Sequence, residues 1–325
     1  MKLLKIICLF LVCMLLGGCA RAASSEACGS DGKYVFLVAG LDDAAQNTDV
    51  LFSIGIDTAI GVVNVCQIPR DTYYGFGKSQ NKINQVFSSA RSAGYSEGEA
   101  MKALKDELAV SLAVDFDGYI ALDLDAFLKL VDALGGIEIT LSSPMTIEID
   151  GMEPVYLNAG VNHIDSKKAE GFVRYRQGYV TQDLGRMDAQ KIFLNAIFYK
   201  LSKSASLPVL MRLAGIMQES SVTDVKLSQL VGLLFSGGTR IKESRFVTLA
   251  GEAVGSKEGI SYYALNRGAS EEIVGKYLFS RGRFDINHRF LNQNEDEFLK
   301  IYSKDNFKYK EYTNETVKDI SLQNR

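Results

Sequence analysis

Short apolar runs of strand length alternate along this chain with stretches of helical periodicity. Residues 34–38, 50–56 and 60–68 are rich in β-branched and other apolar side chains and are bounded by Gly, Asp or Pro, which predicts three strands. Residues 116–121 and 137–141 predict two more. The second of these is expected to return to the same sheet.

Helices are predicted between and after these strands. Ser96 and Glu99 form a capping-box pattern that opens a helix running to about residue 108. Asp123 can cap a second helix, which a pair of glycines at 135–136 ends. A long third helix starts near Asp183 and carries apolar residues on one face. This alternation predicts an α/β fold, a mostly parallel or mixed sheet flanked by helices, in which ligands bind at loops beyond the strand ends.

The N-terminus has the pattern of an export signal. Lys2 and Lys5 flank the start of an apolar run at 6–16, which ends in Leu-Gly-Gly-Cys at 16–19. This run is short for a spanning helix, so residues 1–18 are predicted to be a lipoprotein-type signal peptide, with Cys19 as the lipidation site. An uncleaved N-terminal anchor helix is the alternative. Both place the rest of the chain on the extracytoplasmic face of the cell membrane.

Composition excludes several classes of function. Apart from Cys8, Cys13 and Cys19 of the export segment, Cys28 and Cys66 are the cysteines of the chain, so a disulfide scaffold and a cysteine-ligated zinc site are excluded. Cys66 lies in an apolar strand and is interpreted as a buried thiol, although a bond to Cys28 is possible in an oxidising compartment. Removing Lys2 and Lys5 leaves 34 basic against 39 acidic residues, which argues against a nucleic-acid partner.

The chain divides into four segments. The signal is followed by a linker at 19–32 that is rich in Ser, Ala and Gly, and then by one folded domain at 33–282. Residues 283–325 form a polar C-terminal extension, expected to be a short appended helix or a mobile tail.

Charged residues gather in the loops after the predicted strands. Arginine binds phosphate oxygens through paired, charge-assisted hydrogen bonds. Carboxylates beside such arginines suit a site in which Mg²⁺ lies between them and the phosphates. Spacing alone also fits surface turns, helix caps and solvated ion pairs. The residues concerned are Asp42, Asp49, Arg70, Asp71, Lys82, Arg174, Arg176, Asp183 and Arg186.

Several ordered motifs between residues 35 and 196 resemble the LytR-CpsA-Psr family of cell-wall glycopolymer transferases. Residues 207–279 also look like the closing helices and strand of that family. The motifs are Ile-Pro-Arg-Asp-Thr at 68–72, Lys-Ile-Asn at 82–84, the run 127–136 that ends in Gly-Gly, Ala-Glu-Gly-Phe-Val-Arg-Tyr-Arg at 169–176, and Gly185-Arg186 followed by Gln190.

The resemblance implies an activity and a set of roles. The enzyme would transfer a glycan polymer with its phosphate from polyprenyl diphosphate to a sugar hydroxyl of peptidoglycan, and an apolar groove would hold the lipid. Asp42 and Asp49 would bind Mg²⁺, and Asp183 or Asp71 would act as the base. The diphosphate ligands would be Arg70, Lys82, Arg174, Arg176, Arg186 and Gln190, with Arg70 also counted as catalytic.

This sequence departs from the family pattern at three positions. Ala44, Asn47 and Ala189 stand where family members commonly carry arginine. Losing charged hydrogen bonds, worth roughly 1.5–3 kcal/mol each, would weaken anion binding. Two other functions therefore stay open beside the transferase: a polyprenyl-diphosphate pyrophosphatase, and a non-catalytic protein that binds the lipid diphosphate or acts as an envelope scaffold.

A Gly-Tyr-Ser-Glu-Gly run at 94–98 matches the nucleophile elbow of serine hydrolases. That motif needs a strand immediately before it, and a polar Ser-rich stretch precedes it here. Only His163 and His288 could complete a triad, and Ser96 already suits a helix cap. The serine hydrolase is therefore rejected.

Overall fold

A computed structural model describes most of the folded body of the chain. The described residues are 32–42, 44–74, 82–176, 178–180, 183–204, 220–225, 242–255, 260–284 and 295–320, with a few single positions beside them. The predicted signal and its Cys19, the linker up to residue 31, and Cys28 lie outside them. Among the helices described, none combines the length and apolar character needed to cross a membrane.

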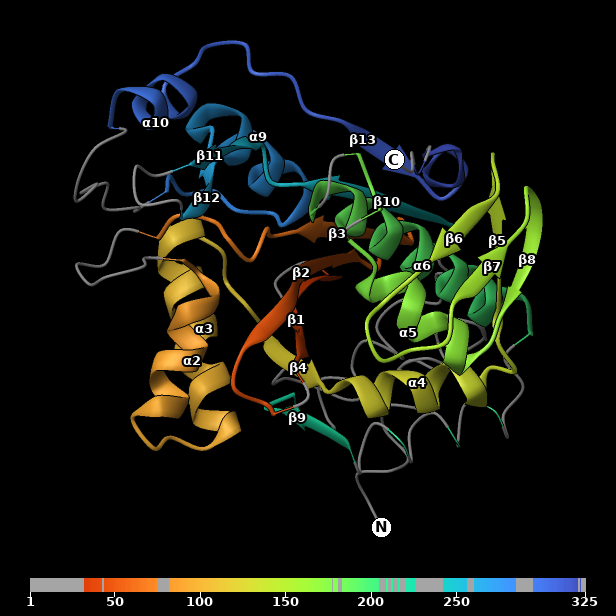
Figure 1. The fold of residues 1–325 in the computed structure, drawn as a ribbon. Helices are drawn as coiled ribbons and strands as arrows, with labels where there is room; N and C mark the ends of the chain where they lie inside the picture. The colour runs from red at the N-terminus through yellow and green to blue at the C-terminus, as the bar shows by residue number, and fades with distance from the viewer. Residues whose placement is uncertain are drawn as a thin grey trace.

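A mixed sheet forms the centre of the molecule (Figure 1). Across the described strands its order is β13-β10-β3-β2-β1-β4-β9. The pairs β1–β4 and β3–β10 are parallel, and the neighbours β1–β2, β2–β3, β4–β9 and β10–β13 are antiparallel. The strand bounds are β1 Lys33–Leu41, β2 Thr48–Asp57, β3 Val62–Gln67, β4 Gly118–Leu122, β9 Ser221–Thr223, β10 Glu243–Thr248 and β13 Glu311–Thr313.

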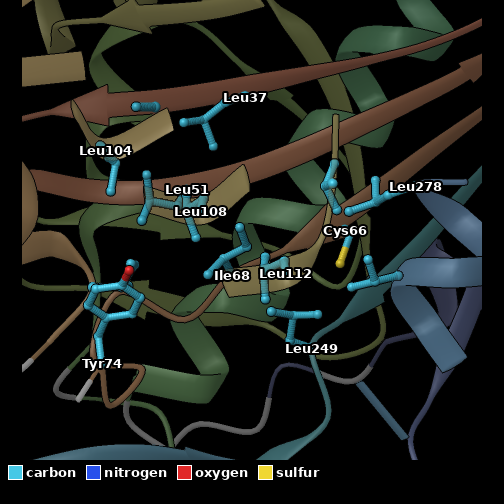
Figure 2. Close-up of a cluster of buried hydrophobic side chains, with 14 of the residues drawn as sticks. Leu37, Leu51, Cys66, Ile68, Tyr74, Leu104, Leu108, Leu112, Leu249 and Leu278 are labelled. Atoms are coloured by element: carbon cyan, nitrogen blue, oxygen red, sulfur yellow. The ribbon is translucent and has the colours of Figure 1, made fainter. Parts of the chain in front are cut away.

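Helices cover both faces of this sheet because both faces are apolar. In β1, Tyr34 and Phe36 pack into one core cluster, whereas Val35 and Leu37 pack into the opposite one. Figure 2 shows Leu37 in the second cluster. Side chains alternate between faces along a strand, so a strand apolar throughout needs cover on two sides. The first cluster lies under α4 (Leu124–Ala133), α5 (Ser166–Arg174) and α6 (Asp183–Ser204), and the second under α2 (Asn84–Ser92), α3 (Glu97–Leu112) and α9 (Arg267–Tyr277).

The helix starts predicted from the sequence are confirmed. Glu99 N donates to Ser96 Oγ (3.3 Å) and Ser96 N to Glu99 Oε2 (2.8 Å), so the capping box of α3 is complete. Asp123 Oδ1 accepts the backbone N–H of Ala126 (2.7 Å) at the start of α4. Ser96 is thus a helix cap and has no nucleophile-elbow geometry, because a turn rather than a strand precedes it.

Strand β5 (Ile137–Leu141) has the predicted bounds but does not join the central sheet. It pairs with β8 (Gly160–Ile164), while β6 (Met145–Ile147) pairs with β7 (Val155–Leu157). Ile137, Ile139 and Leu141 are buried, whereas Glu138 and Thr140 are exposed. A strand with one polar face is stable in a sheet that exposes that face to solvent. It would be less stable in a sheet that helices cover on both faces.

The C-terminal segment continues the fold. Helix α10 (Glu295–Tyr302) corresponds to the short appended helix, one of the two alternatives expected for this segment, and it packs on the hairpin of β11 (Gly251–Gly255) and β12 (Ser261–Leu265). Strand β13 then adds an antiparallel edge to β10, and a 3-10 turn (Val317–Asp319) follows. Val317 is fully buried. The extension is therefore part of the packed body at these positions.

Cys66 is a free thiol buried in β3, as its apolar surroundings indicated (Figure 2). Burial raises the pKa of this thiol to about 12, because the thiolate would be removed from water. The thiol therefore acts as a small apolar side chain in the core rather than as a nucleophile.

Gly55 of β2 provides a test of how α9 packs on the sheet. Its partner across the ladder is Asn64, whose Nδ2 donates to the Tyr277 carbonyl at the end of α9 (3.1 Å). A Cβ added to Gly55 would lie 2.2 Å from that same carbonyl oxygen. We expect Gly55→Ala to lower the free energy of unfolding by about 1–3 kcal/mol in urea denaturation.

Gly255→Ala is the matched control, because an added Cβ there meets no atom within 4 Å. Its effect should stay within about 0.5 kcal/mol. Equal stability of Gly55→Ala and the wild type would contradict the described contact between α9 and β2.

Candidate functional site

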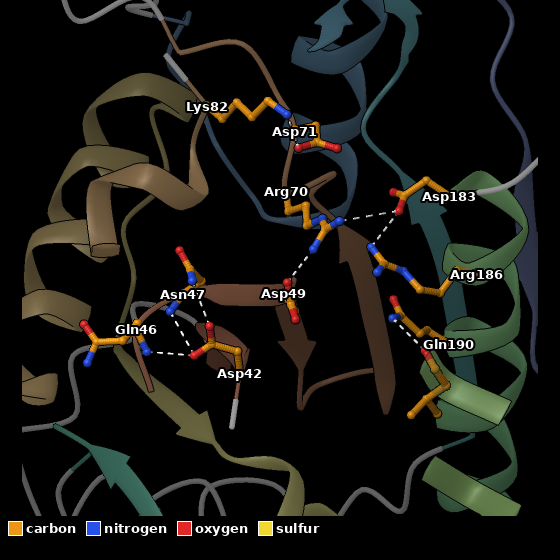
Figure 3. Close-up of polar contacts among 11 residues, drawn as sticks. Asp42, Gln46, Asn47, Asp49, Arg70, Asp71, Lys82, Asp183, Arg186 and Gln190 are labelled. Atoms are coloured by element: carbon orange, nitrogen blue, oxygen red, sulfur yellow. Dashed lines mark hydrogen bonds and ion pairs between the residues drawn. The ribbon is translucent and has the colours of Figure 1, made fainter. Parts of the chain in front are cut away.

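Charged side chains meet at one edge of the central sheet, where β1 ends, β2 begins and β3 ends (Figure 3). Antiparallel neighbours bring these three strand ends together, so Asp42, Asp49 and Arg70 lie at the same edge. Helix α6 adds Asp183, Arg186 and Gln190 from its first two turns. The edge thus collects residues that are far apart in the sequence.

Arg70 lies in a tight turn after β3. Thr72 donates to the Pro69 carbonyl through both its backbone N (2.9 Å) and its Oγ1 (2.6 Å), which fixes the turn. The Arg70 guanidinium donates from Nη1 to Asp49 Oδ1, and its Nη2 lies 4.0 Å from Asp183 Oδ1. Arg70 therefore links β2 to α6 through two carboxylates.

Asp183 and Arg186 form a second ion pair within the first turn of α6. Arg186 Nη2 lies 2.7 Å from Asp183 Oδ1, and the Arg186 side chain is largely buried. A carboxylate at a helix N-terminus is stabilised by the helix dipole. Burial lowers the pKa of Arg186, whereas the neighbouring Asp183 opposes that shift.

Buried hydrogen-bonding groups in this cluster lack partners. Within the described residues, Arg70 Nε and Arg186 Nε are buried donors without an acceptor, and Asp183 Oδ1 has its ion pairs but no hydrogen bond. Buried polar groups are nearly always satisfied, by protein, water or ligand. Both arginines approach the same carboxylate, that of Asp183. An anion with several oxygens could accept hydrogen bonds from both of their unpaired Nε donors.

Gln190 makes two hydrogen bonds within the protein. Its Oε1 accepts a hydrogen bond from Gln67 Nε2 (3.0 Å), and its own Nε2 donates to the Val173 carbonyl (3.4 Å). Gln67 is the last residue of β3, so this bond ties β3 to α6 three residues before Arg70. Sequence reasoning missed Gln67, although a polar residue ending an apolar strand signals a buried partner.

Asp71 and Lys82 form a separate pair beside Arg70. Lys82 Nζ donates to Asp71 Oδ1 (2.8 Å), and an isolated bridge pairs Lys82 with Tyr73. The Lys82 ammonium also lies 5.7 Å from the centre of the Tyr262 ring, within range of a cation–π contact. This pair extends the charged edge away from α6 (Figure 3).

Arg174 and Arg176 lie outside the central cluster. Arg174 pairs with Glu170 one turn earlier in α5 (2.6 Å), and its side chain is exposed. Arg176 is also exposed, but it is near enough to Arg186 to lower the pKa of that guanidinium. The predicted site residues are therefore brought together only in part: Arg176 lies near Arg186, and Arg174 is paired within α5.

Asp42 is held by its own turn. Its Oδ1 accepts from the backbone N–H groups of Gln46 (2.7 Å) and Asn47 (3.1 Å), and its Oδ2 accepts from Asn47 Nδ2 (2.7 Å). Burial raises the pKa of this carboxyl, but the three hydrogen bonds together bring it below its ordinary value of 3.8. Asn47, which replaces a commonly found arginine, thus serves the carboxylate directly.

The structure also shows what surrounds the other two residues that depart from the family pattern, Ala44 and Ala189. Ala44 is exposed on the same turn, where its carbonyl accepts from the Gln46 side chain (3.2 Å). Ala189 belongs to α6 and is fully buried where that helix packs into the first core cluster. The fold therefore closes around position 189, and a cation there would need a different packing.

The hydrogen bonds of the two aspartates predicted to hold Mg²⁺ leave some of their carboxylate acceptor positions unused. Each ionised carboxylate has about four acceptor positions. Asp42 uses three for its turn, and Asp49 accepts from Arg70 at one oxygen. Among the described residues no group of three or more Asp, Glu, His or Cys side chains suits a metal. The set fits an ion that takes its remaining ligands from phosphate and water, as Mg²⁺ does.

Comparison with known proteins assigns the family. The model of the LytR_cpsA_psr family matches residues 20–277. This chain belongs to the LytR-CpsA-Psr family. The match includes every member of the charged edge, and the predicted resemblance is confirmed.

Two sequence relatives are transferases by name. The chain is 23% identical to the polyisoprenyl-teichoic acid–peptidoglycan teichoic acid transferase TagV of Bacillus subtilis (strain 168) over 222 residues, which is 64% of this chain and 54% of TagV. It therefore spans about half the length of TagV. It is 24% identical to TagU of Bacillus mycoides (strain KBAB4) over 246 residues, 74% of this chain and 76% of TagU.

Solved structures share the LytR-CpsA-Psr fold. The crystal structure of Bacillus subtilis TagV superposes with a TM-score of 0.62 at 19% identity, covering 78% of this chain and all of that one. TagT bound to LIIa-WTA gives a TM-score of 0.59 at 19% identity, covering 80% of this chain and 95% of that one. The predicted α/β class, a mixed sheet flanked by helices, is confirmed.

Removing the Asn47 amide should raise the pKa of Asp42. We expect the pKa of Asp42 in Asn47→Ala to move back toward its ordinary value, as measured by NMR titration of the carboxyl carbon. Because a lowered folded pKa stabilises the protein above the ordinary pKa, Asn47→Ala should cost up to about 1 kcal/mol at neutral pH, allowing for solvent screening. The difference should shrink as the pH falls below 3.8.

Gln46→Ala is the control for this effect, because it keeps the backbone donor of residue 46 and removes only a bond to the Ala44 carbonyl. An Asp42 pKa that is the same in Asn47→Ala and the wild type would contradict the assignment of the amide as its partner.

Proposed function

We propose that this protein transfers a glycopolymer from a polyprenyl diphosphate carrier to peptidoglycan through a phosphodiester bond. The observation that carries the proposal is the pair of arginines, Arg70 and Arg186, whose buried Nε donors lack acceptors at the edge of the sheet. Two adjacent guanidinium groups match the spread of charge on a diphosphate. Lys82, Arg174 and Arg176 would add positive charge around the same edge.

The names of relatives support this class of substrate. TagV and TagU act on polyisoprenyl-linked teichoic acid and peptidoglycan according to their names, and TagT has been solved with LIIa-WTA. The names of TagV and TagU share a polymer carried on a polyisoprenyl lipid. We therefore assign this chain a polyprenyl-diphosphate-linked glycan as donor, without naming the polymer.

In the proposed reaction, an acceptor hydroxyl oxygen attacks the phosphorus that carries the glycan. The bond between this phosphorus and the bridging oxygen breaks, and polyprenyl phosphate leaves with the electron pair. Arg70 and Arg186 would stabilise the negative charge on the phosphate oxygens. Asp183 is the better placed base for the hydroxyl proton, because it lies between both arginines, whereas Asp71 is held by Lys82 on the far side of Arg70.

Asp42 and Asp49 would hold Mg²⁺ in this proposal. When bound, the ion would neutralise charge on the diphosphate and on its leaving group. Asp49 would then share its carboxylate between Arg70 and the metal site. We also propose, from the N-terminal sequence, that the chain is exported and that a lipid on Cys19 keeps the enzyme at the extracytoplasmic surface, where its lipid substrate would lie.

Purified protein comprising residues 20–325 should join a lipid-diphosphate glycan to peptidoglycan oligomers in the presence of Mg²⁺. We expect Arg70→Ala to lower the transfer rate at least about tenfold, since a charged hydrogen bond is worth roughly 1.5–3 kcal/mol. Arg174→Ala should have a smaller effect, because its exposed side chain is held by Glu170. Arg245→Ala is the control, an arginine that pairs with Glu243 outside the site.

The same assay separates the alternatives. A pyrophosphatase would release polyprenyl phosphate and glycan phosphate without an acceptor, and a binding protein would retain the lipid diphosphate unchanged. Equal product from the wild type and Arg70→Ala, or none from either, would overturn the transferase assignment.

Asp49→Asn should weaken metal binding. We expect its affinity for Mn²⁺, followed by electron paramagnetic resonance as a probe of the Mg²⁺ site, to fall at least about tenfold, because a carboxylate ligand is lost. Asp71→Asn is the matched control, since the Asp71 carboxylate binds Lys82. Chelation by EDTA should stop transfer by the wild type, and added Mg²⁺ should restore it. Similar Mn²⁺ affinities of the two variants would rule out Asp49 as a ligand.

A further inference from the structure

Helix α10 lies beyond the residues that the family model matches, yet it is anchored in the fold. The match ends at residue 277, and α10 begins at Glu295. Phe298 and Ile301 of this helix are buried. At its end, the carbonyls of Ile301 and Lys304 accept hydrogen bonds from the buried Nδ2 of Asn266 (2.7 and 2.8 Å). A helix held in this way can support neighbouring side chains.

A row of aromatic rings leads from α10 to the charged edge. The Phe298 ring packs on Tyr73 with centroids 5.3 Å apart, and Tyr73 packs edge-to-face on Tyr262 with centroids 5.5 Å apart. The Lys82 ammonium lies over the Tyr262 ring and donates to Asp71. Aromatic pairs at these distances are attractive beyond the area they bury.

The backbone provides a second route to the same pair. Tyr73 N donates to the Tyr263 carbonyl (2.9 Å), and Tyr263 N donates to the Asp71 carbonyl (2.8 Å). The segment from Asp71 to Tyr73 is thereby fixed to β12, the strand on which α10 packs. Tyr73 also forms the bridge with Lys82. Movement of Tyr73 would therefore shift Asp71 and Lys82 together.

We propose that Phe298 is a positioning residue for Lys82. Its ring holds Tyr73 and Tyr262 in place, and these two side chains direct the Lys82 ammonium toward Asp71 and the neighbouring Arg70. The C-terminal segment thereby becomes part of the anion-binding unit. The identity of the anion as a diphosphate rests on the proposed function, but the placement of Lys82 does not.

A positioning role for Phe298 can be distinguished from a purely structural one. A buried aromatic residue that only stabilises the fold would change anion binding to the same extent whether or not Lys82 is present. A residue that acts through Lys82 loses its effect once Lys82 is removed. A double-mutant cycle measures this difference.

Phe298→Leu removes the ring but keeps an apolar side chain in the core. With inorganic pyrophosphate as the probe in titration calorimetry, we expect this variant to bind about threefold to tenfold more weakly than the wild type. In the Lys82→Ala background the same change should alter the affinity by less than about twofold. Phe298→Tyr, which keeps the ring, should bind like the wild type.

A second measurement follows Lys82 itself. Limited acetylation of the whole protein with an N-hydroxysuccinimide ester, read by mass spectrometry, should modify Lys82 faster in Phe298→Leu, because its contacts with Asp71 and Tyr262 are loosened. Ile301→Ala is the matched control, since it removes a buried side chain from the same helix without a ring against Tyr73. It should leave the acetylation of Lys82 and the pyrophosphate affinity unchanged.

The outcomes separate the two proposals. An equal loss of pyrophosphate affinity in the presence and absence of Lys82, or faster acetylation of Lys82 in Ile301→Ala as well, would overturn the positioning role. A wild-type protein that does not bind pyrophosphate would count against the proposed function. In that case the acetylation of Lys82 in Phe298→Leu still decides the positioning role.

Discussion

Two arginines of like charge, Arg70 and Arg186, face one carboxylate, that of Asp183, and this contact joins the central sheet to helix α6. Their mutual repulsion would drive them apart without the carboxylates of Asp183 and Asp49. The hydrogen bond from Gln67 to Gln190 holds the same two elements together one layer deeper. The arrangement of the whole charged edge depends on this junction.

The fold keeps the junction in register. Strand β3 is buried on both faces, so its end cannot shift without disturbing two core clusters. At α6, a Cβ on Gly185 would lie 2.6 Å from the buried Tyr179 ring. Glycine therefore lets the 178–180 segment pack directly against the start of the helix. Arg70 thus lies in a hydrogen-bonded turn directly after β3 and Arg186 lies on α6, which favours pre-organised binding.

The ion pairs also indicate how the charged side chains are arranged when no substrate is bound. Each guanidinium already has a carboxylate partner, so an incoming diphosphate would exchange partners rather than meet unpaired cations. The buried Nε donors would gain acceptors that the described residues do not supply. Such an exchange favours binding of an anion with many oxygens over binding of a single carboxylate, because the anion accepts hydrogen bonds from several donors together. The proposed lipid diphosphate has this property.

The local pattern of apolar and polar residues was enough to predict the early strands and the caps at Ser96 and Asp123, because periodicity and capping act within a few residues. The motifs that carry the family resemblance are also local. Helix α2 was missed, since it has no side-chain cap and forms by burying Phe87 against its neighbours. The sequence could name Arg70, Asp183 and Gln190 but not their partners. Gln67 and Gln190 are 123 residues apart, and only the packing of α6 on the sheet brings them together. The sequence therefore determined the chemistry available, and the tertiary structure decided which charges meet, because ion pairs depend on distance in space and not along the chain.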